Sequence, residues 1–215
     1  MPSSPKVSIL TPTWNRPDDL KRCIESVLNQ TFQDWEQIVY NVGEPVEVPA
    51  DPRIRYCEGE RKGPAADFQA ALDLASGSVV HPLSDDDRLP PHALATALDA
   101  LGSSDWLVGG TVIVGEQGPW AIRGGRQTHL TATREGSYML GGAVYWRKEF
   151  SDRLGGFKTE FDGAADFDLY LRFLEDSEPA LTAQILYLYN DHAQSDSRAN
   201  AGRQSDASQR IAAGA

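Results

Sequence analysis

Short apolar runs alternate with amphipathic segments along the first half of the chain. Residues 7–10 are apolar and rich in β-branched side chains, which favours a buried strand, and residues 17–30 repeat apolar positions at helical spacing. The same alternation predicts strands at 35–40, 53–56 and 79–83 and helices at 63–77 and 90–101. Strands that alternate with helices are typical of a parallel α/β sheet, whose ligands bind at the carboxyl ends of the strands.

The second half has a different pattern. Residues 106–114 and 142–146 read as strands, and a Gly-rich, Arg-containing segment, 115–134, joins them as a candidate mobile loop. A helix is predicted at 164–175 and a last strand at 180–189. Residues 194–215 are small and polar, so we expect them to be disordered or to lie over the surface.

Composition and charge narrow the classes of function. The 215 residues carry a net charge of −11, which repels phosphate backbones and argues against a nucleic-acid partner. The two cysteines have neither the number for a disulfide framework nor the spacing of a zinc or redox motif. No apolar run is long enough to span a membrane, and the N-terminus lacks a secretion signal. We therefore expect a reduced, cytoplasmic protein.

Three consecutive carboxylates, Asp85, Asp86 and Asp87, follow the strand predicted at 79–83. Such a cluster repels itself unless a cation or solvent relieves it, and carboxylate oxygens suit Mg²⁺ or Mn²⁺. These ions commonly use one or two carboxylates together with substrate phosphates. The alternative is a solvated acidic turn that precedes the helix starting near Pro90.

Four segments, taken in order, resemble family 2 glycosyltransferases of the GT-A fold: residues 7–16 (VSILTPTWNR), 23–31 (CIESVLNQT), 62–91 (with KGPAA and LSDDDRLPP) and 154–172 (with LGGF and ADFDLYLR). The resemblance runs from about residue 6 to residue 192. It implies a single α/β GT-A, Rossmann-like domain at 1–192, with a mostly parallel central sheet, helices on both faces and a smaller antiparallel acceptor-side portion. The nucleotide-binding half would be 6–102, the acceptor half 103–192, and the polar tail 193–215.

The resemblance also implies an activity. The expected protein is an inverting, metal-dependent glycosyltransferase that uses Mn²⁺ or Mg²⁺. Its expected partners are a nucleoside diphosphate sugar, with a UDP-sugar as the first choice, and a glycan or another hydroxyl acceptor.

Residue by residue, the family pattern makes Asp86 the metal-binding aspartate of the DXD motif, assisted by Asp87, and His192 a further metal ligand. The expected nucleotide-binding residues are Pro12, Trp14, Arg16, Asn41 and Asp85. For two of these residues a purely structural role stays open. Trp14 could be a core aromatic, and His192 could be a structural histidine.

Asp166 is the expected general base, because an acceptor hydroxyl must lose a proton as it attacks the anomeric carbon. The alternative is that Asp166 and Asp168 only favour a helix start through the helix dipole. Asp166 follows the Gly155-Gly156-Phe157 turn in the order typical of the family, which favours the catalytic role.

The sequence departs from the family pattern at three places. Asn41 stands where an aspartate would contact a uracil ring, Phe68 replaces an arginine that can bind phosphate, and Ala165 replaces a glutamate before the catalytic aspartate. These departures permit an unusual donor, or a non-catalytic sugar-nucleotide or glycan-binding relative. A nucleotidyltransferase is disfavoured, because Thr11-Pro12-Thr13-Trp14 is not a Gly-rich phosphate loop.

Overall fold

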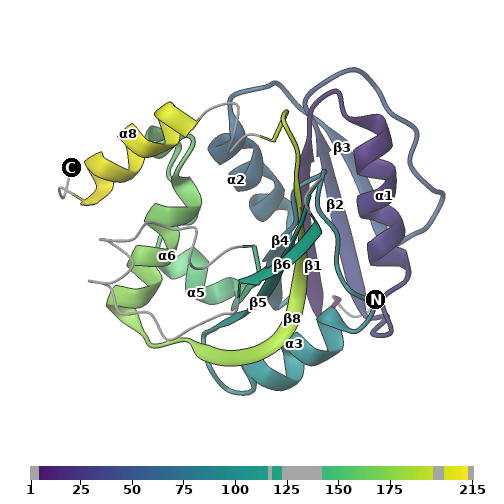
Figure 1. Cartoon of the computed structure of the whole chain (residues 1–215). Helices are drawn as coiled ribbons and strands as arrows, with labels where there is room; N and C mark the ends of the chain where they lie inside the picture. The colour runs from purple at the N-terminus through teal and green to yellow at the C-terminus, as the bar shows by residue number, and fades with distance from the viewer. Residues whose placement is uncertain (1–4, 116–117, 123–141, 196–200, 213–215) are drawn as a thin grey trace.

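The structure, a computed structural model, describes residues 5–115, 118–122, 142–195 and 201–212 (Figure 1). The first half follows the predicted alternation of strand and helix. Its elements are β1 (Val7–Thr13), α1 (Pro17–Leu28), β2 (Trp35–Asn41), β3 (Ile54–Glu58), α2 (Pro64–Leu74), β4 (Val79–Pro82) and α3 (Ala93–Leu101). α1 begins at a proline, whose missing N–H would be unpaired there anyway, and acidic residues in its first turn favour the positive helix end.

The second half contains β5 (Trp106–Gly115), β6 (Gly118–Ile122), β7 (Val144–Arg147), α5 (Lys148–Arg153), the 3₁₀ helix η2 (Thr159–Phe161), α6 (Ala165–Asp176), β8 (Ala180–Asp191) and α8 (Ala201–Ala212). The expected mobile loop at 115–134 is wrong for residues 118–122, which form a strand antiparallel to the end of β5. Pairing with β5 holds residues 118–122 in a strand, although the Gly-rich composition of the segment favours a loop. The rest of that segment, 116–117 and 123–134, lies outside the described residues.

The described strands form one eight-stranded sheet in the order β3-β2-β1-β4-β7-β5-β6, with β8 paired to β5. β1 pairs in parallel with β2 and β4, β2 with β3, and β5 with β8. The antiparallel pairs are β4–β7, β5–β7 and β5–β6, all toward one side of the sheet. The predicted fold class, a mostly parallel sheet with a smaller antiparallel portion, is confirmed.

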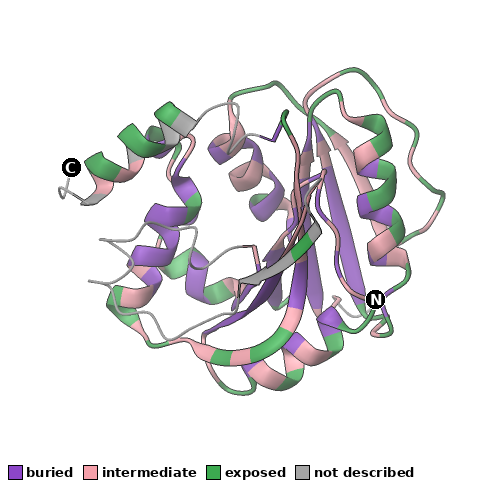
Figure 2. Ribbon diagram, in the orientation of Figure 1, coloured by how far each residue is buried: buried purple, intermediate pink, exposed green. Residues whose placement is uncertain are grey.

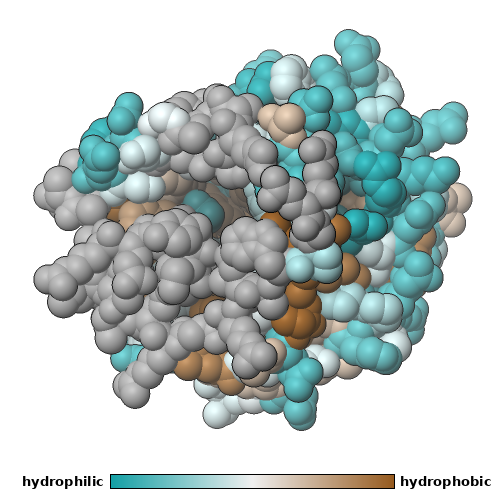
Figure 3. Space-filling view, viewed as in Figure 1, coloured by the Kyte–Doolittle hydropathy of each residue, from teal (hydrophilic) through white to brown (hydrophobic). Residues whose placement is uncertain are grey.

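Helices cover both faces of the sheet, and the central strands β1, β2, β4 and β7 are largely buried (Figure 2). Because side chains alternate along a strand, Leu10 of β1 packs with α2, α5 and α6, whereas Val7 and Ile9 pack with α1 and α3. The two faces therefore have separate hydrophobic clusters. The outer surface around α1 is mostly hydrophilic (Figure 3).

The C-terminal segment is helical where it is described. α8 lies against α6, and Ile211 packs on Ala164, Phe167 and Leu171. Of the two expectations for residues 194–215, disorder is therefore wrong for 201–212, which lie over the surface instead. No helix within the described ranges has both the length and the apolar character that a membrane span requires. The cytoplasmic location stays a prediction.

Candidate active site

Most of the predicted site residues lie at one edge of the sheet. β1, β2 and β4 are parallel, so their carboxyl ends meet at this edge. β4 and β5 are both antiparallel to β7, and β8 is parallel to β5, so β8 ends there too. The topology thus brings together Arg16 after β1, Asp85–Asp87 after β4 and His192 after β8.

Asp86 lies at the centre of this group. Its Oδ2 accepts a hydrogen bond from Arg16 Nη1 at 2.6 Å and lies 3.1 Å from His192 Nε2. Arg16 Nη2 also donates to the carbonyl oxygen of Gln194 at 2.9 Å. Partial burial acts to lower the pKa of Arg16, but the charges of Asp85 and Asp86 leave it raised. One guanidinium therefore joins the start of α1, the residues after β4 and the segment after β8.

Asp85 is buried, and both its oxygens are bonded. Oδ2 accepts from Thr13 Oγ1 at 2.7 Å, and Oδ1 accepts from Arg16 Nη1 at 3.2 Å. Burial, together with the charge of Asp86, raises the pKa of Asp85 to about 6, although Thr13 and Arg16 act in the opposite direction. A carboxyl group with a perturbed pKa in a cluster of polar side chains is typical of a functional site.

Asp87 faces β8 instead. Its Oδ2 accepts from Tyr187 Oη at 2.7 Å, and its Oδ1 accepts from the backbone N–H of Asn190, also at 2.7 Å. Burial raises the pKa of Asp87 well above its usual range, and the charge of Asp86 adds to this effect. The structure therefore does not bring Asp87 to the pair formed by Asp86 and His192. Asp87 instead holds β8 against the segment 85–87.

Asp86 and His192 offer a carboxylate oxygen and an imidazole nitrogen on one side of the cluster. Among the residues that the structure describes, no three His, Cys, Asp or Glu side chains converge closely enough to hold a metal by themselves. Mg²⁺ and Mn²⁺ are often bound by one or two protein side chains and completed by substrate phosphates. The donor set fits such an incomplete site.

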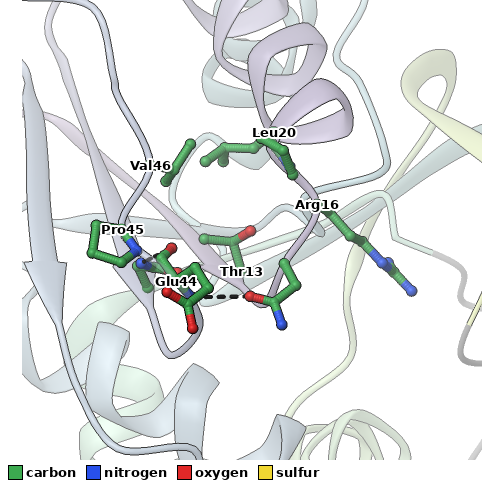
Figure 4. Close-up of a pocket in the computed structure, with 9 residues that line it drawn as sticks. Thr13, Arg16, Leu20, Glu44, Pro45 and Val46 are labelled. Carbon is green, nitrogen blue, oxygen red and sulfur yellow. Dashed lines mark hydrogen bonds between the residues drawn. The ribbon is translucent and has the colours of Figure 1, made fainter.

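A pocket opens beside the cluster, between the end of β1, the start of α1 and the loop after β2 (Figure 4). It is lined by Thr13, Asn15, Arg16, Pro17, Leu20, Asn41, Glu44, Pro45 and Val46. The guanidinium of Arg16 extends away from the loop that carries Pro45 and Val46 (Figure 4). The pocket and the carboxylate cluster therefore lie on two sides of Arg16.

Asn41 shapes the wall of this pocket. Its Nδ2 donates to the carbonyl oxygen of Glu44 at 2.9 Å and to Tyr56 Oη at 2.8 Å, while its Oδ1 accepts from Gly43 N–H at 3.1 Å. Asn15 Oδ1 accepts from Glu44 N–H at 2.9 Å. The side chain of Asn41 is buried and engaged with the loop, which leaves it little capacity to contact a base.

Trp14 and Pro12 lie near the end of β1. Trp14 is 46% exposed as a residue, which excludes the alternative of a core aromatic. Pro12 lies opposite Tyr40 of β2 and is partly buried. Trp14 is thus the more accessible of the two expected nucleotide contacts.

Asp166 and Asp168 both lie in the first turn of α6 but differ in exposure. Asp166 is exposed, and its Oδ1 accepts from the N–H of Phe167 at 2.8 Å. Asp168 is buried, and its Oδ2 accepts from Arg172 Nε at 2.9 Å and Nη2 at 2.6 Å. Arg172 also donates to the carbonyls of Leu154 and Gly156. Asp168 therefore belongs to an ion pair that supports the Gly-Gly turn.

Phe68, which replaces the arginine of the family pattern, and the neighbouring Gln69 join α2 to the same turn. The Phe68 ring lies 5.6 Å from that of Phe157, and Gln69 Oε1 accepts from Phe157 N–H at 2.7 Å. Gly156 has a positive φ of 62°, and a Cβ there would lie 2.2 Å from Gln69 Oε1. This part of α2 is therefore used for packing.

Sequence reasoning missed Thr13, Tyr187 and Asn190 as partners of the aspartates. Thr13 ends β1 and Tyr187 lies within β8, so each reads as an ordinary strand residue. A polar side chain at the carboxyl end of a predicted parallel strand was the available signal for Thr13. Tyr187 had no such signal, because its position beside Asp87 depends on the pairing of β8 with β5.

Comparison with known proteins identifies the family of the chain. The sequence model described as Glycosyl transferase family 2 matches residues 8–172. The chain is 29% identical over 218 residues to a putative colanic acid biosynthesis glycosyl transferase, WcaA, of Escherichia coli, covering 90% of this chain and 76% of that protein. It is 32% identical over 124 residues to the GalNAc(5)-diNAcBac-PP-undecaprenol beta-1,3-glucosyltransferase of Campylobacter jejuni, covering 53% of this chain and 40% of that protein.

Solved structures with the same fold are more distant in sequence. Residues 1–349 of S. aureus TarS in complex with UDP superpose with a TM-score of 0.69 at 18% identity, covering 87% of this chain and 61% of that one. The mannosyltransferase PcManGT of Pyrobaculum calidifontis, in complex with GDP-Man and Mn²⁺, gives a TM-score of 0.61 at 18% identity, covering 87% and 57%. The chain thus spans about three fifths of these structures, and at this identity they support the fold alone.

Proposed function

The chain belongs to glycosyl transferase family 2, and we propose that it is an inverting, metal-dependent enzyme that transfers a sugar from a nucleoside diphosphate sugar to a hydroxyl of a glycan or related acceptor. The observation that carries the proposal is the meeting of Asp86, His192 and Arg16 at the carboxyl edge of the sheet. Asp86 and His192 can bind a cation, and Arg16 can bind phosphate. This combination suits a bound diphosphate and its metal counter-ion.

In this proposal the donor nucleotide binds at the ends of β1 and β2. Trp14 provides an exposed aromatic face for the base, and Pro12 and Asn41 support the strand ends and the adjoining loop. Asp85, oriented by Thr13, lies on the ribose side. Relatives of this fold carry UDP, UDP-GlcNAc or GDP-Man, which makes a UDP-sugar the first donor to test and a GDP-sugar the second.

Asp86 and His192 would hold Mn²⁺ or Mg²⁺, and Asp87 would contribute by fixing β8, which leads into His192. The cation would supply positive charge that stabilises the departing diphosphate. Arg16, which now bonds Asp86, is also long enough and charged enough to bind a phosphate oxygen. Asp166 would accept the proton of the acceptor hydroxyl as that oxygen attacks the anomeric carbon, and a single in-line displacement inverts that centre.

A transfer assay tests the proposal. Purified protein is supplied with UDP- and GDP-sugars, Mn²⁺ and glycan acceptors, and nucleoside diphosphate release is measured with and without EDTA. We expect turnover that EDTA abolishes, and loss of turnover in Asp86→Ala but not in Asp99→Ala, an exposed carboxylate on α3. Equal turnover with and without Mn²⁺ would contradict the metal role.

The second candidate is a non-catalytic sugar-nucleotide or glycan-binding protein. It is favoured by Ala165, which removes the carboxylate next to Asp166, and by the engagement of Asn41 with its own loop. Donor binding without hydrolysis or transfer, over a broad panel of donors and acceptors, would support this alternative.

A further inference from the structure

An arginine stacks on the exposed tryptophan at the nucleotide end of the sheet. The guanidinium carbon of Arg61 lies 3.3 Å from the centroid of the Trp14 ring. Trp14 follows β1 and Arg61 follows β3, so the stack bridges the end of β2, which lies between those strands. Gly43, just after β2, lies close to the ring, since a Cβ there would be 3.1 Å from Trp14 Cδ1.

The backbone on both sides of Arg61 is anchored. Gly59 N–H donates to the carbonyl oxygen of Asn41 at 2.9 Å, and Lys62 N–H donates to Asp67 Oδ1 at 3.4 Å. The Arg61 side chain itself is exposed and forms no ion pair with any carboxylate in the described part of the chain. A fixed backbone thus presents a long, accessible cation over an aromatic face.

We propose that Arg61 is a donor-binding residue that closes over the nucleotide base from the side opposite Trp14. This inference rests on the proposed function. A base that enters between the two side chains replaces the Arg61–Trp14 stack with two stacks, one on each side chain. Planar guanidinium groups stack on the aromatic ring of a base as they do on tryptophan. The exposed arginine side chain can move outward to admit the base without any change in the backbone.

The charge of Arg61 also suits an anionic donor, in addition to its contact with the base. The chain has a net charge of −11, and three aspartates follow β4, so an anionic diphosphate needs nearby cations. Phe68, which replaces the arginine of the family pattern, is packed on Phe157 and supplies none. Arg61 lies three residues before the start of α2 and provides a cation at the same end of that helix.

Calorimetric titration with UDP, GDP, ADP and CDP, each in the presence of Mn²⁺, tests the clamp. Arg61→Met removes the charge and the planar group but keeps most of the aliphatic stem, and Arg61→Lys restores the charge alone. Lys62→Met is the matched control at the next exposed cation. We expect Arg61→Met to weaken binding of the preferred nucleotide about 3- to 30-fold, with Arg61→Lys between it and the wild type. The corresponding monophosphate should also lose affinity, since the stacking contact is to the base.

Other outcomes separate the clamp from the proposed function. If the wild type binds a nucleoside diphosphate and Arg61→Met binds it equally or more tightly, the clamp is overturned and the donor site stands. The same loss in Lys62→Met as in Arg61→Met also overturns the clamp, since it would reflect general attraction. If the wild type binds none of UDP, GDP, ADP and CDP, both the proposed function and the clamp are overturned. Unfolding temperatures of the variants, expected to equal that of the wild type, verify that they are folded.

Discussion

Asp166 and Asp168 are two residues apart in α6, yet their surroundings differ. Asp168 is buried in an ion pair with Arg172, whereas Asp166 is exposed in the first turn. A general base must reach a substrate proton, which a carboxylate closed inside an ion pair cannot do. The contrast between the two neighbours therefore favours Asp166 as the residue that acts on the acceptor.

Asp166→Asn should lower the transfer rate about 10²- to 10⁴-fold, because the amide cannot accept a proton at neutral pH. Donor binding and the unfolding temperature should change little. Asp168→Asn is the control, and it should cost about 1–3 kcal/mol of stability by leaving Arg172 poorly paired. Steady-state rates and thermal unfolding on the same preparations measure both effects. Wild-type turnover in Asp166→Asn would remove Asp166 from the catalytic role.

Asn41→Asp tests whether residue 41 reads the base or supports the loop. A carboxylate cannot donate to the carbonyl of Glu44, so we expect a stability loss of about 1–2 kcal/mol and weaker UDP binding. Asn29→Asp, at an exposed position after α1, makes the same change of charge as a control. Denaturation and UDP titration are the measurements. Tighter UDP binding in Asn41→Asp would mean that residue 41 contacts the base directly.

At the scale of the elements, local pattern predicted the first half of the fold well. The strand that contains Val7–Leu10 and the helix that starts at Pro17 are fixed by apolar spacing and by end signals that lie within a few residues. β1 is longer than its apolar run and continues to Thr13, because it is paired with β2 over its whole length. A strand's end thus depends on its neighbour, which the run alone does not reveal.

Long-range pairing explains what sequence reasoning could not reach. The resemblance named Asp86 and His192, but their approach within 3.1 Å depends on β8 running parallel to β5. The same pairing turns Asp87 toward Tyr187 and away from the expected metal ligands. Residue type and motif order predicted which side chains belong to the site, whereas strand register determined which of them face one another.

α8 should contribute modestly to stability. Ile211 is partly buried against Ala164, Phe167 and Leu171, so removing residues 196–215 should cost about 1–3 kcal/mol and leave a folded domain. The cut falls after Ser195 because Gln194 bonds Arg16 in the site. Ile211→Ala should lose part of that stability, and Gln209→Ala, exposed on α8, should lose none. An insoluble or molten truncation, seen by circular dichroism, would contradict this account.

At the scale of the whole molecule, the stability of the fold at acid pH depends on buried groups whose protonation acts in opposite directions. Asp85, with a pKa of about 6, takes up a proton more readily in the folded protein than in the unfolded chain, so it stabilises the fold as pH falls. His81 does the reverse. It lies fully buried on β4, stacked on Tyr145 with ring centroids 4.0 Å apart, and its Nδ1 lies 3.0 Å from the carbonyl oxygen of Val144.

Burial lowers the pKa of His81 to about 4, against about 6.5 in an unfolded chain. Between these values the unfolded chain binds the extra proton, so the stability that neutral His81 provides is complete above pH 6.5 and is lost as pH falls toward 4, by about 3 kcal/mol. His81→Asn keeps an N–H donor for Val144 but does not titrate. Urea denaturation of both proteins from pH 7.5 to 4.5 isolates the effect, because the aspartates cancel in the difference. The wild type's advantage over His81→Asn should shrink steadily below pH 6.5, and a difference that stays constant with pH would show that His81 is not the group responsible.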